Sequence, residues 1–232
     1  MEDFDVDSLA AFLHTTPDQV RKLASRGKLP GRRIAGNWLF PREEMHHWLE
    51  QRIGVSDSEQ LEKMEAQLSR RHAPIDGEVS IAALCRPENM AFPLSARTRT
   101  SVIRNMCDLA AVGGLLWDVP TMTNAVRQRE ELHPTALAGG VALLHPRRPQ
   151  SSILAESLIA LGITETPLPF SGDGQLTDIF FLICSYDDKS HLRILARLSR
   201  LVSDPQWLPA LRDCKTPNDA HTLIRVGEDD LA

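Results

Sequence analysis

Two histidines in the second half of the chain have the residue type and position for phosphoryl chemistry. His145 ends an apolar run preceded by two glycines, and His191 begins an amphipathic helical pattern after a second apolar run. Strand ends and helix N-termini meet at one edge of an α/β sheet, so the two imidazoles are predicted to share a site. One neutral imidazole can attack a phosphoryl group, and a second imidazole, an arginine and helix N-terminal amides can stabilise its charge. From the spacing alone, the alternative is that both histidines are ordinary polar residues at the end of a strand and the start of a helix, without a chemical role.

The elements that would position these histidines alternate between strand and helix patterns from residue 75 onward. This pattern is typical of an α/β fold, α+β for the chain as a whole. Residues 138–145 are predicted to form a buried strand, and residues 178–185 a strand that is apolar on both faces. Residues 153–163 mix strand and turn signals. Five helices are predicted from apolar spacing, at residues 102–110, 122–132, 191–201, 207–211 and 220–224.

A different organisation is predicted for the first part of the chain. Apolar residues recur at helical spacing from Val6 to Leu13. Thr16-Pro17-Asp18 then has the form of a helix start, with a capping hydroxyl, a proline at the first helical position and an acid beside the helix dipole. That helix is predicted to end at Gly27, and two helices joined by a tight turn form a helix-turn-helix. A hairpin around Ala35-Gly36 and a third helix over residues 42–49 complete the pattern.

The charge of the chain is unevenly distributed. The net charge is -5, with 42% hydrophobic and 25% charged residues, which fits a globular protein that is not basic overall. Residues 1–53 carry eight basic and eight acidic residues. Seven of those basic residues lie between Val20 and Arg42, an interval that contains neither Asp nor Glu. A local basic surface of this kind indicates contact with a phosphate backbone.

Residues 5–53 resemble the small winged helix-turn-helix domains of the excisionase and MerR-type class. The resemblance is carried by Val6–Leu13, Thr16–Leu23, Gly27–Pro30 and Trp38–Arg42. It implies a recognition helix at residues 17–26 that enters the major groove of double-stranded DNA, and a wing at residues 32–38. The candidate DNA contacts are Gln19, Arg21, Lys22, Arg26, Arg32, Arg33 and Trp38. The alternative is that these cations form only a solvated face.

Residues 54–74 separate the two parts and have a helix start at Ser56–Glu59. Leu61, Met64 and Leu68 share one face of a short polar helix. We interpret this segment as a helical linker between a domain at residues 1–53 and a domain at residues 75–232. The alternative is a dimerisation helix, which would make a second copy of the chain a partner, since helix-turn-helix proteins often bind as pairs.

Residues 78–226 resemble the fructose/mannitol-type IIA domains of the bacterial phosphotransferase system, including their nitrogen-regulatory relatives. The matching segments are Arg129–Thr135, Gly140–Arg147, Asp173–Gln175, His191–Leu198 and Asp204–Leu211. The resemblance implies a mixed sheet flanked by helices. It also implies that His145 accepts a phosphoryl group from a histidine-phosphorylated carrier protein and that His191 stabilises this group. Arg129 and Thr135 stand where the family lines its site, and Arg147 in the following basic loop completes the candidate set.

The sequence departs from the family pattern next to the acceptor histidine and in one loop. Leu144 stands where proline is usual, and His133–Ala136 replaces the usual Gly-Ser-Thr-Gly. His133 therefore either adds an imidazole near the site or is a surface residue. The two domains together predict a regulator whose DNA binding responds to phosphorylation of His145. The departures favour an alternative, a docking protein that is not phosphorylated. A third reading, a sugar-transport IIA component, is disfavoured by the helix-turn-helix.

Neither a metal nor a cofactor is predicted. The four cysteines lack zinc-site spacing, and the adjacent His46 and His47 would point about 100° apart on a helix. No apolar run approaches the ~20 residues that span a bilayer, and the acidic start of the chain is unlike a signal peptide. We therefore expect a cytoplasmic protein whose thiols are reduced and serve packing.

Overall fold

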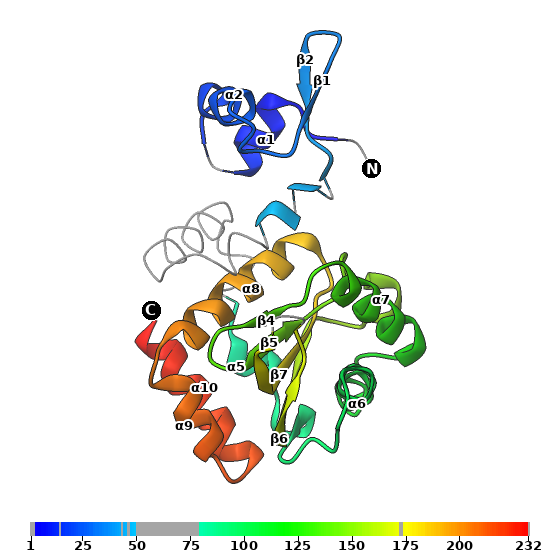
Figure 1. Cartoon of the computed structure of the whole chain (residues 1–232), viewed down its shortest axis with the longest axis vertical. Coiled ribbons are helices and arrows are strands. Elements are labelled where there is room, and N and C mark those ends of the chain that lie inside the picture. Colours follow the sequence, from blue (N-terminus) through cyan, green and yellow to red (C-terminus); the bar gives the residue numbers. More distant parts are fainter. Residues whose placement is uncertain are drawn as a thin grey trace. The chain divides into compact units, whose positions relative to one another are not determined.

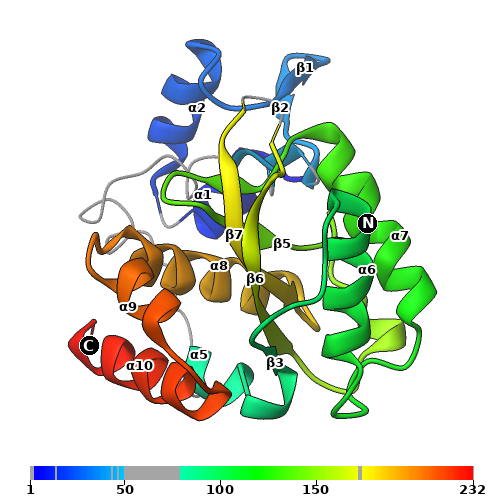
Figure 2. The same ribbon diagram turned by 60° about the horizontal axis from the view of Figure 1, so that its bottom comes forward.

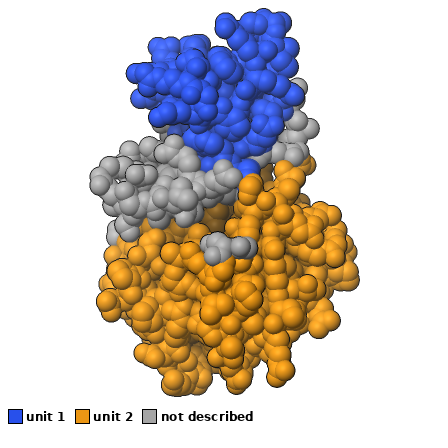
Figure 3. Space-filling model, in the orientation of Figure 1, with its two compact units in different colours: residues 1–76 blue, residues 77–232 orange. Residues whose placement is uncertain are grey.

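The computed structural model describes residues 3–13, 15–42, 44–45, 47–49, 79–171 and 174–231. The chain divides into two compact units, Met1–Asp76 and Gly77–Ala232 (Figure 3). The predicted linker helix with Leu61, Met64 and Leu68 lies outside the described residues, as does His46. The two units are described separately below.

The first unit begins with the helices α1 (Val6–Phe12) and α2 (Pro17–Ser25), which pack against each other. A hairpin follows, formed by β1 (Arg32–Ile34) and β2 (Asn37–Leu39). Its two-residue turn has positive φ at both positions, as tight hairpins require. A small core holds the helices and the hairpin together, and its buried members are Phe4, Leu9, Ala10, Val20, Ala24, Leu29, Phe40 and Met45.

The start of α2 is fixed by a capping box, as the sequence predicts. The Thr16 hydroxyl accepts a hydrogen bond from the Gln19 amide, and the Gln19 side chain accepts one from the Thr16 amide. Pro17 occupies the first helical position, and Gly27 has a φ of 66° just beyond the helix. The second helix of the predicted helix-turn-helix is therefore formed by local sequence signals at both ends.

The second unit is built on a mixed sheet with the strand order β3-β6-β7-β5-β4. The β3–β6 and β5–β7 pairs are parallel, and the other neighbouring strands are antiparallel. The strands are β3 (Met90–Ala91), β4 (Ala136–Leu137), β5 (Val141–Leu144), β6 (Leu158–Pro169) and β7 (Leu176–Cys184). The mixed sheet agrees with the predicted α/β class.

Helices cover both faces of this sheet (Figures 1 and 2). One face carries α6 (Arg99–Ala110) and α7 (Val119–Leu132). The other carries α5 (Ile81–Leu84), α8 (Asp188–Ser203), α9 (Trp207–Asp213) and α10 (Pro217–Asp230).

Alternate residues of the central strands serve these two layers. Leu144 and Phe180 belong to the core beneath α6 and α7, whereas Phe181 stacks on Trp207 of α9. Burial on both faces explains why β5 and the central part of β7 are continuous apolar runs rather than alternating ones.

Arg212 of α9 joins the segment before β5 to the beginning of β7. Its guanidinium donates to both carboxylate oxygens of Asp178, each at 2.7 Å, and to the Gly139 carbonyl at 2.5 Å. Gly140 has a φ of 81°, and a Cβ atom there would lie 2.8 Å from the guanidinium. The absence of a side chain at Gly140 therefore permits the close approach of Arg212, and the positive φ of this residue favours glycine.

Glu228 of α10 joins the last helix of the unit to its first. Its carboxylate accepts hydrogen bonds from the Ser80 hydroxyl and from the amides of Ile81 and Ala82, at the N-terminus of α5. It also forms a buried ion pair with Arg197 of α8, with 2.9 Å between Nε and Oε1. One carboxylate thus satisfies helix-terminal amides and a buried guanidinium together.

Candidate functional site

The parallel pairing of β5 and β7 brings two chain segments to the same edge of the sheet. Leu144 and Leu182 are in register, so His145 after β5 and Ser185 after β7 leave the sheet on the same side. His191 lies in the first turn of α8, and its ring centroid is 5.1 Å from that of His145. Both histidines are buried, with 2% and 3% of their surfaces exposed. The structure therefore brings the two imidazoles together in one enclosed cluster.

The tautomer of neutral His145 follows from its backbone partner. Its Nδ1 atom lies 2.8 Å from the carbonyl oxygen of Leu143. A carbonyl oxygen can only accept, so Nδ1 carries the proton and Nε2 carries the lone pair. The Nε2 atom is buried. His145 can therefore act as a nucleophile through Nε2 while Nδ1 remains bonded to the backbone.

His191 is held by a residue that sequence reasoning missed. The hydroxyl oxygen of Ser185 lies 3.1 Å from Nδ1 of His191, and Ser185 is 1% exposed. Burial raises the pKa of the preceding Cys184 thiol well above its usual value, with the nearby Cys107 adding to the effect. That thiol therefore stays neutral beside the cluster. The only sequence signal for Ser185 is its position directly after a buried strand.

Thr135 is fixed by a buried carboxylate. Its carbonyl accepts from the Leu143 amide, two residues before His145, at 3.2 Å. Its amide lies 3.1 Å from Oε1 of Glu130, and its hydroxyl donates to the same atom. Arg99 of α6 pairs with Glu130 across 3.2 Å. Glu130 and Arg99 were not among the predicted site residues, although they hold one that was.

The remaining predicted site residues are Arg129, in the last turn of α7, and Arg147, in the loop after β5. Arg129 is 5% exposed, and its Nη1 atom donates to the His133 carbonyl at 2.7 Å, which fixes the turn before Thr135. The His133 residue itself is exposed, as is Arg147 after the acceptor position. His133 therefore joins the site through its backbone, and its imidazole lies at the surface.

The predicted DNA contacts lie on the surface of the first unit. Gln19, Arg21, Lys22 and Arg26 of α2 are exposed, but Gln19 also caps the helix and Arg21 pairs with Asp18 at 2.8 Å. On the hairpin the predicted contacts also have internal partners: Arg32 pairs with Asp3, Arg33 donates to the Gly36 carbonyl, and half-buried Trp38 stacks near Phe40. Lys22 and Arg26 remain as cations for which the described part of the chain shows no internal partner.

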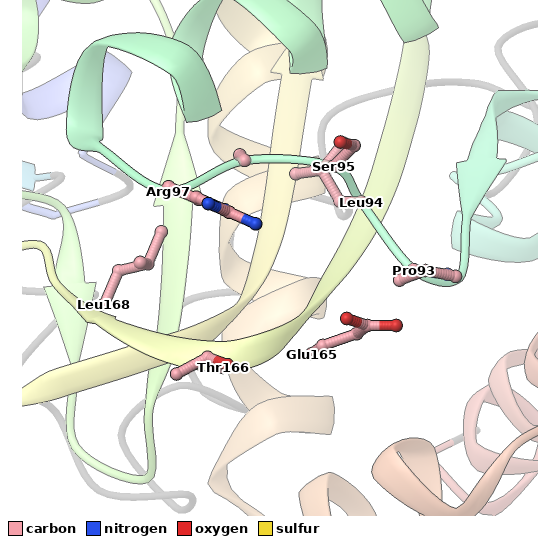
Figure 4. A pocket seen from close by; sticks show the side chains of 8 residues that line it. Pro93, Leu94, Ser95, Arg97, Glu165, Thr166 and Leu168 are labelled. Carbon is pink, nitrogen blue, oxygen red and sulfur yellow. The ribbon is translucent and has the colours of Figure 1, made fainter.

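A separate cavity of about 550 Å³ lies along β6 (Figure 4). Figure 4 shows Arg97 projecting across it, with Glu165 and Thr166 on the strand below. Its lining contains none of the predicted site residues. Within the described ranges, no group of three or more His, Cys, Asp or Glu residues is arranged to hold a metal ion. No helix in those ranges is long and apolar enough to cross a membrane.

Two family models match the chain. The family described as phosphoenolpyruvate-dependent sugar phosphotransferase system, EIIA 2, matches residues 83–226, and a helix-turn-helix domain matches residues 4–53. A nitrogen regulatory protein from Bradyrhizobium diazoefficiens is 35% identical over 102 residues, or 43% of this chain. The chain spans 65% of that relative's length, which is less than two thirds.

Solved structures share the fold of the second unit at low sequence identity. Nitrogen regulatory protein IIA-Ntr from Neisseria meningitidis has a TM-score of 0.56 at 16% identity, covering 62% of this chain and 98% of its own. The IIA mannitol structure from Escherichia coli has a TM-score of 0.53 at 18% identity, covering 59% and 96%. The EIIA 2 match spans more than half of the chain. The protein therefore belongs to the EIIA 2 family of the phosphotransferase system and carries a helix-turn-helix domain within its first 53 residues.

Proposed function

We propose that this protein is a regulator in which phosphorylation of His145 by a histidine-phosphorylated carrier protein changes DNA binding, and thereby transcription. The observation that carries the proposal is the enclosed pair of imidazoles, 5.1 Å apart, where β5 and β7 end. The helix-turn-helix on the same chain supplies the reason to connect phosphorylation with DNA.

In the proposed step, the Nε2 lone pair of His145 attacks the phosphorus atom of the carrier's phosphohistidine. A nitrogen–phosphorus bond forms on His145 while the carrier's own bond breaks, and its electron pair returns to the carrier's imidazole. The His145 ring becomes positively charged, so its Nδ1 bond to the Leu143 carbonyl becomes charge-assisted and stronger. His191 is assigned to the phosphoryl oxygens.

The coupling to DNA is proposed to be electrostatic. The phosphoryl group carries roughly -1.5 to -2 charges near pH 7, and the positive charge that the His145 ring gains offsets part of them, so the net change is negative. The group would arrive beside the exposed basic loop that contains Arg147 and Arg148. A change of this size can alter a docking surface or the association of two copies of the chain. Either change would alter how the exposed cations of α2 are presented to DNA.

The phosphotransfer assay tests this proposal directly. The full chain is incubated with ³²P-labelled, histidine-phosphorylated carrier protein of the phosphotransferase system, and DNA binding is then compared for both forms. The wild type should be labelled and His145→Ala should not. His133→Ala is the matched control, since its imidazole is exposed and the backbone carbonyl that Arg129 binds is retained. Label that persists in His145→Ala would contradict the assignment of the acceptor.

A docking protein without phosphorylation is the second candidate function. It is favoured by Leu144 at the position where the family usually has proline, and by the replaced loop at residues 133–136. The same experiment separates the two candidates. Carrier binding without label supports docking alone, whereas label that alters DNA binding supports the regulator.

A further inference from the structure

Ser185 is placed to control the second imidazole of the site. It is the first residue after β7, so the strand pairing with β5 and β6 fixes its backbone. Its side chain is buried, and its hydroxyl oxygen lies 3.1 Å from Nδ1 of His191. Neither the sequence motifs nor the family pattern assigns a role to Ser185.

The direction of this hydrogen bond follows from the need to satisfy a buried hydroxyl. A serine hydroxyl can donate or accept, whereas neutral imidazole donates through one nitrogen and accepts through the other. Among the described residues, Nδ1 of His191 is the one hydrogen-bond partner of the Ser185 hydroxyl. If Nδ1 carried the proton, the buried hydroxyl hydrogen would lack an acceptor, which is costly. Ser185 donating to Nδ1 satisfies that hydrogen and places the His191 proton on the buried Nε2 atom, where an incoming phosphoryl oxygen can accept it.

We infer that Ser185 is a positioning residue that holds neutral His191 as the Nε2–H tautomer. The Leu143 carbonyl imposes the opposite tautomer on His145, with its proton on Nδ1. The cluster then pairs one imidazole whose Nε2 bears a lone pair with another whose Nε2 bears a proton. The first suits attack on phosphorus, and the second can donate to a phosphoryl oxygen without first gaining a charge. This inference rests on the proposed function, whereas the NMR test of the tautomer does not require phosphorylation.

The test compares two buried serines with the same chemical change. Ser185→Ala removes the hydroxyl that faces His191, and Ser199→Ala removes a buried hydroxyl from α8 that has no partner among the described residues. Ser185→Thr retains a hydroxyl at the same position. Nitrogen-15 NMR of the full unphosphorylated chain, under conditions where imidazole is neutral, reports which His191 nitrogen carries the proton. Initial rates of labelling from ³²P-phosphorylated carrier protein give the catalytic effect.

The wild type and Ser199→Ala should both show His191 as the Nε2–H tautomer. Ser185→Ala should show a mixture and a labelling rate about three- to tenfold lower, the range expected for one lost hydrogen bond. Ser185→Thr should restore both properties. A wild-type His191 protonated on Nδ1, or an unchanged tautomer in Ser185→Ala, would overturn the inference. If wild-type protein takes no label, the proposed function fails, but the NMR result still decides the tautomer.

Discussion

The Nδ1 atom of His145 lies 2.8 Å from the carbonyl oxygen of Leu143, two residues earlier in the chain. This bond turns the ring so that one nitrogen is committed to the backbone. The phosphorylated form should therefore be the Nε2 isomer, because attack through Nδ1 would require the bond to break. Phosphorus-31 and nitrogen-15 NMR of the phosphorylated chain distinguish the isomers. A phosphoryl group on Nδ1 would contradict the geometry of the site.

The affinity for DNA should depend more on Lys22 than on the neighbouring Arg21. Lys22→Ala should weaken binding and lower the slope of log K against log salt by about 1, as expected for one lost phosphate contact. Arg21→Ala should have a smaller effect, because Asp18 at 2.8 Å already neutralises part of that charge. Fluorescence anisotropy over a salt series measures both. Lys215→Ala, an exposed lysine of the second unit, is the charge-matched control. Binding that is insensitive to salt and to both changes in α2 would indicate a protein partner.

The carboxylate of Glu228 should be a major contributor to the stability of the second unit. Glu228→Ala removes a carboxylate partner of buried Arg197 and the cap of α5, so a loss of about 3–5 kcal/mol in unfolding free energy is expected. Asp229→Ala deletes the adjacent, exposed carboxylate and should change stability by less than ~0.5 kcal/mol. Urea unfolding of the full chain gives both values. Similar effects of the two substitutions would show that the network is not stabilising.

The cysteines should differ sharply in reactivity. Burial raises the pKa of Cys107 to about 11 and also raises the pKa values of Cys85 and Cys184 well above the usual range of a thiol. Partial burial, followed by Asp219 and Asp213, raises the pKa of Cys214 as well. Alkylation needs the thiolate, so at pH 8 the half-buried Cys214 should react first and slowly, while the others react only after unfolding. Peptide mapping by mass spectrometry follows each site, and rapid native modification of Cys184 would refute this order.

The raised pKa values of these thiols make the folding stability fall as the pH rises into the alkaline range. Their folded-state pKa values exceed the unfolded value of about 8.5, so the unfolded chain loses protons first as the pH rises. Their contribution to stability is complete below that value and declines above it.

Elements with strong local signals could be predicted from the sequence. The capped start of α2 and the tight hairpin rest on residues that act within one turn, and the structure has both. The apolar runs of β5 and β7 predict strands buried on both faces, and the structure has them. By contrast, the two-residue strands β3 and β4 are too short to show a period. The segment with mixed strand and turn signals, residues 153–163, covers only the first half of the twelve-residue β6. Its second half was not predicted as a strand, because Pro167 and Pro169 interrupt the pattern there.

The last helix shows how packing overrides a local signal. Only residues 220–224 were predicted as helical, whereas α10 runs from Pro217 to Asp230. Gly227 weakens the helical pattern, yet a Cβ at that position would lie 2.8 Å from Nε1 of Trp207. The glycine is therefore explained by close packing against α9. Ser185, Glu130 and Glu228 escaped sequence reasoning for a related reason, because each gains its role only from residues brought together by the tertiary fold.

The bond between Glu228 and the first turn of α5 has a topological consequence for the second unit. Its first and last helices, α5 and α10, are in contact through these bonds, so the two ends of the unit lie close together. Such a unit is suited to circular permutation. New termini opened in the exposed turn at Gly113-Gly114, with the old ones joined by a short peptide, should leave the sheet and the two histidines in place. The position of the chain termini in the second unit should therefore not determine whether its histidine site forms.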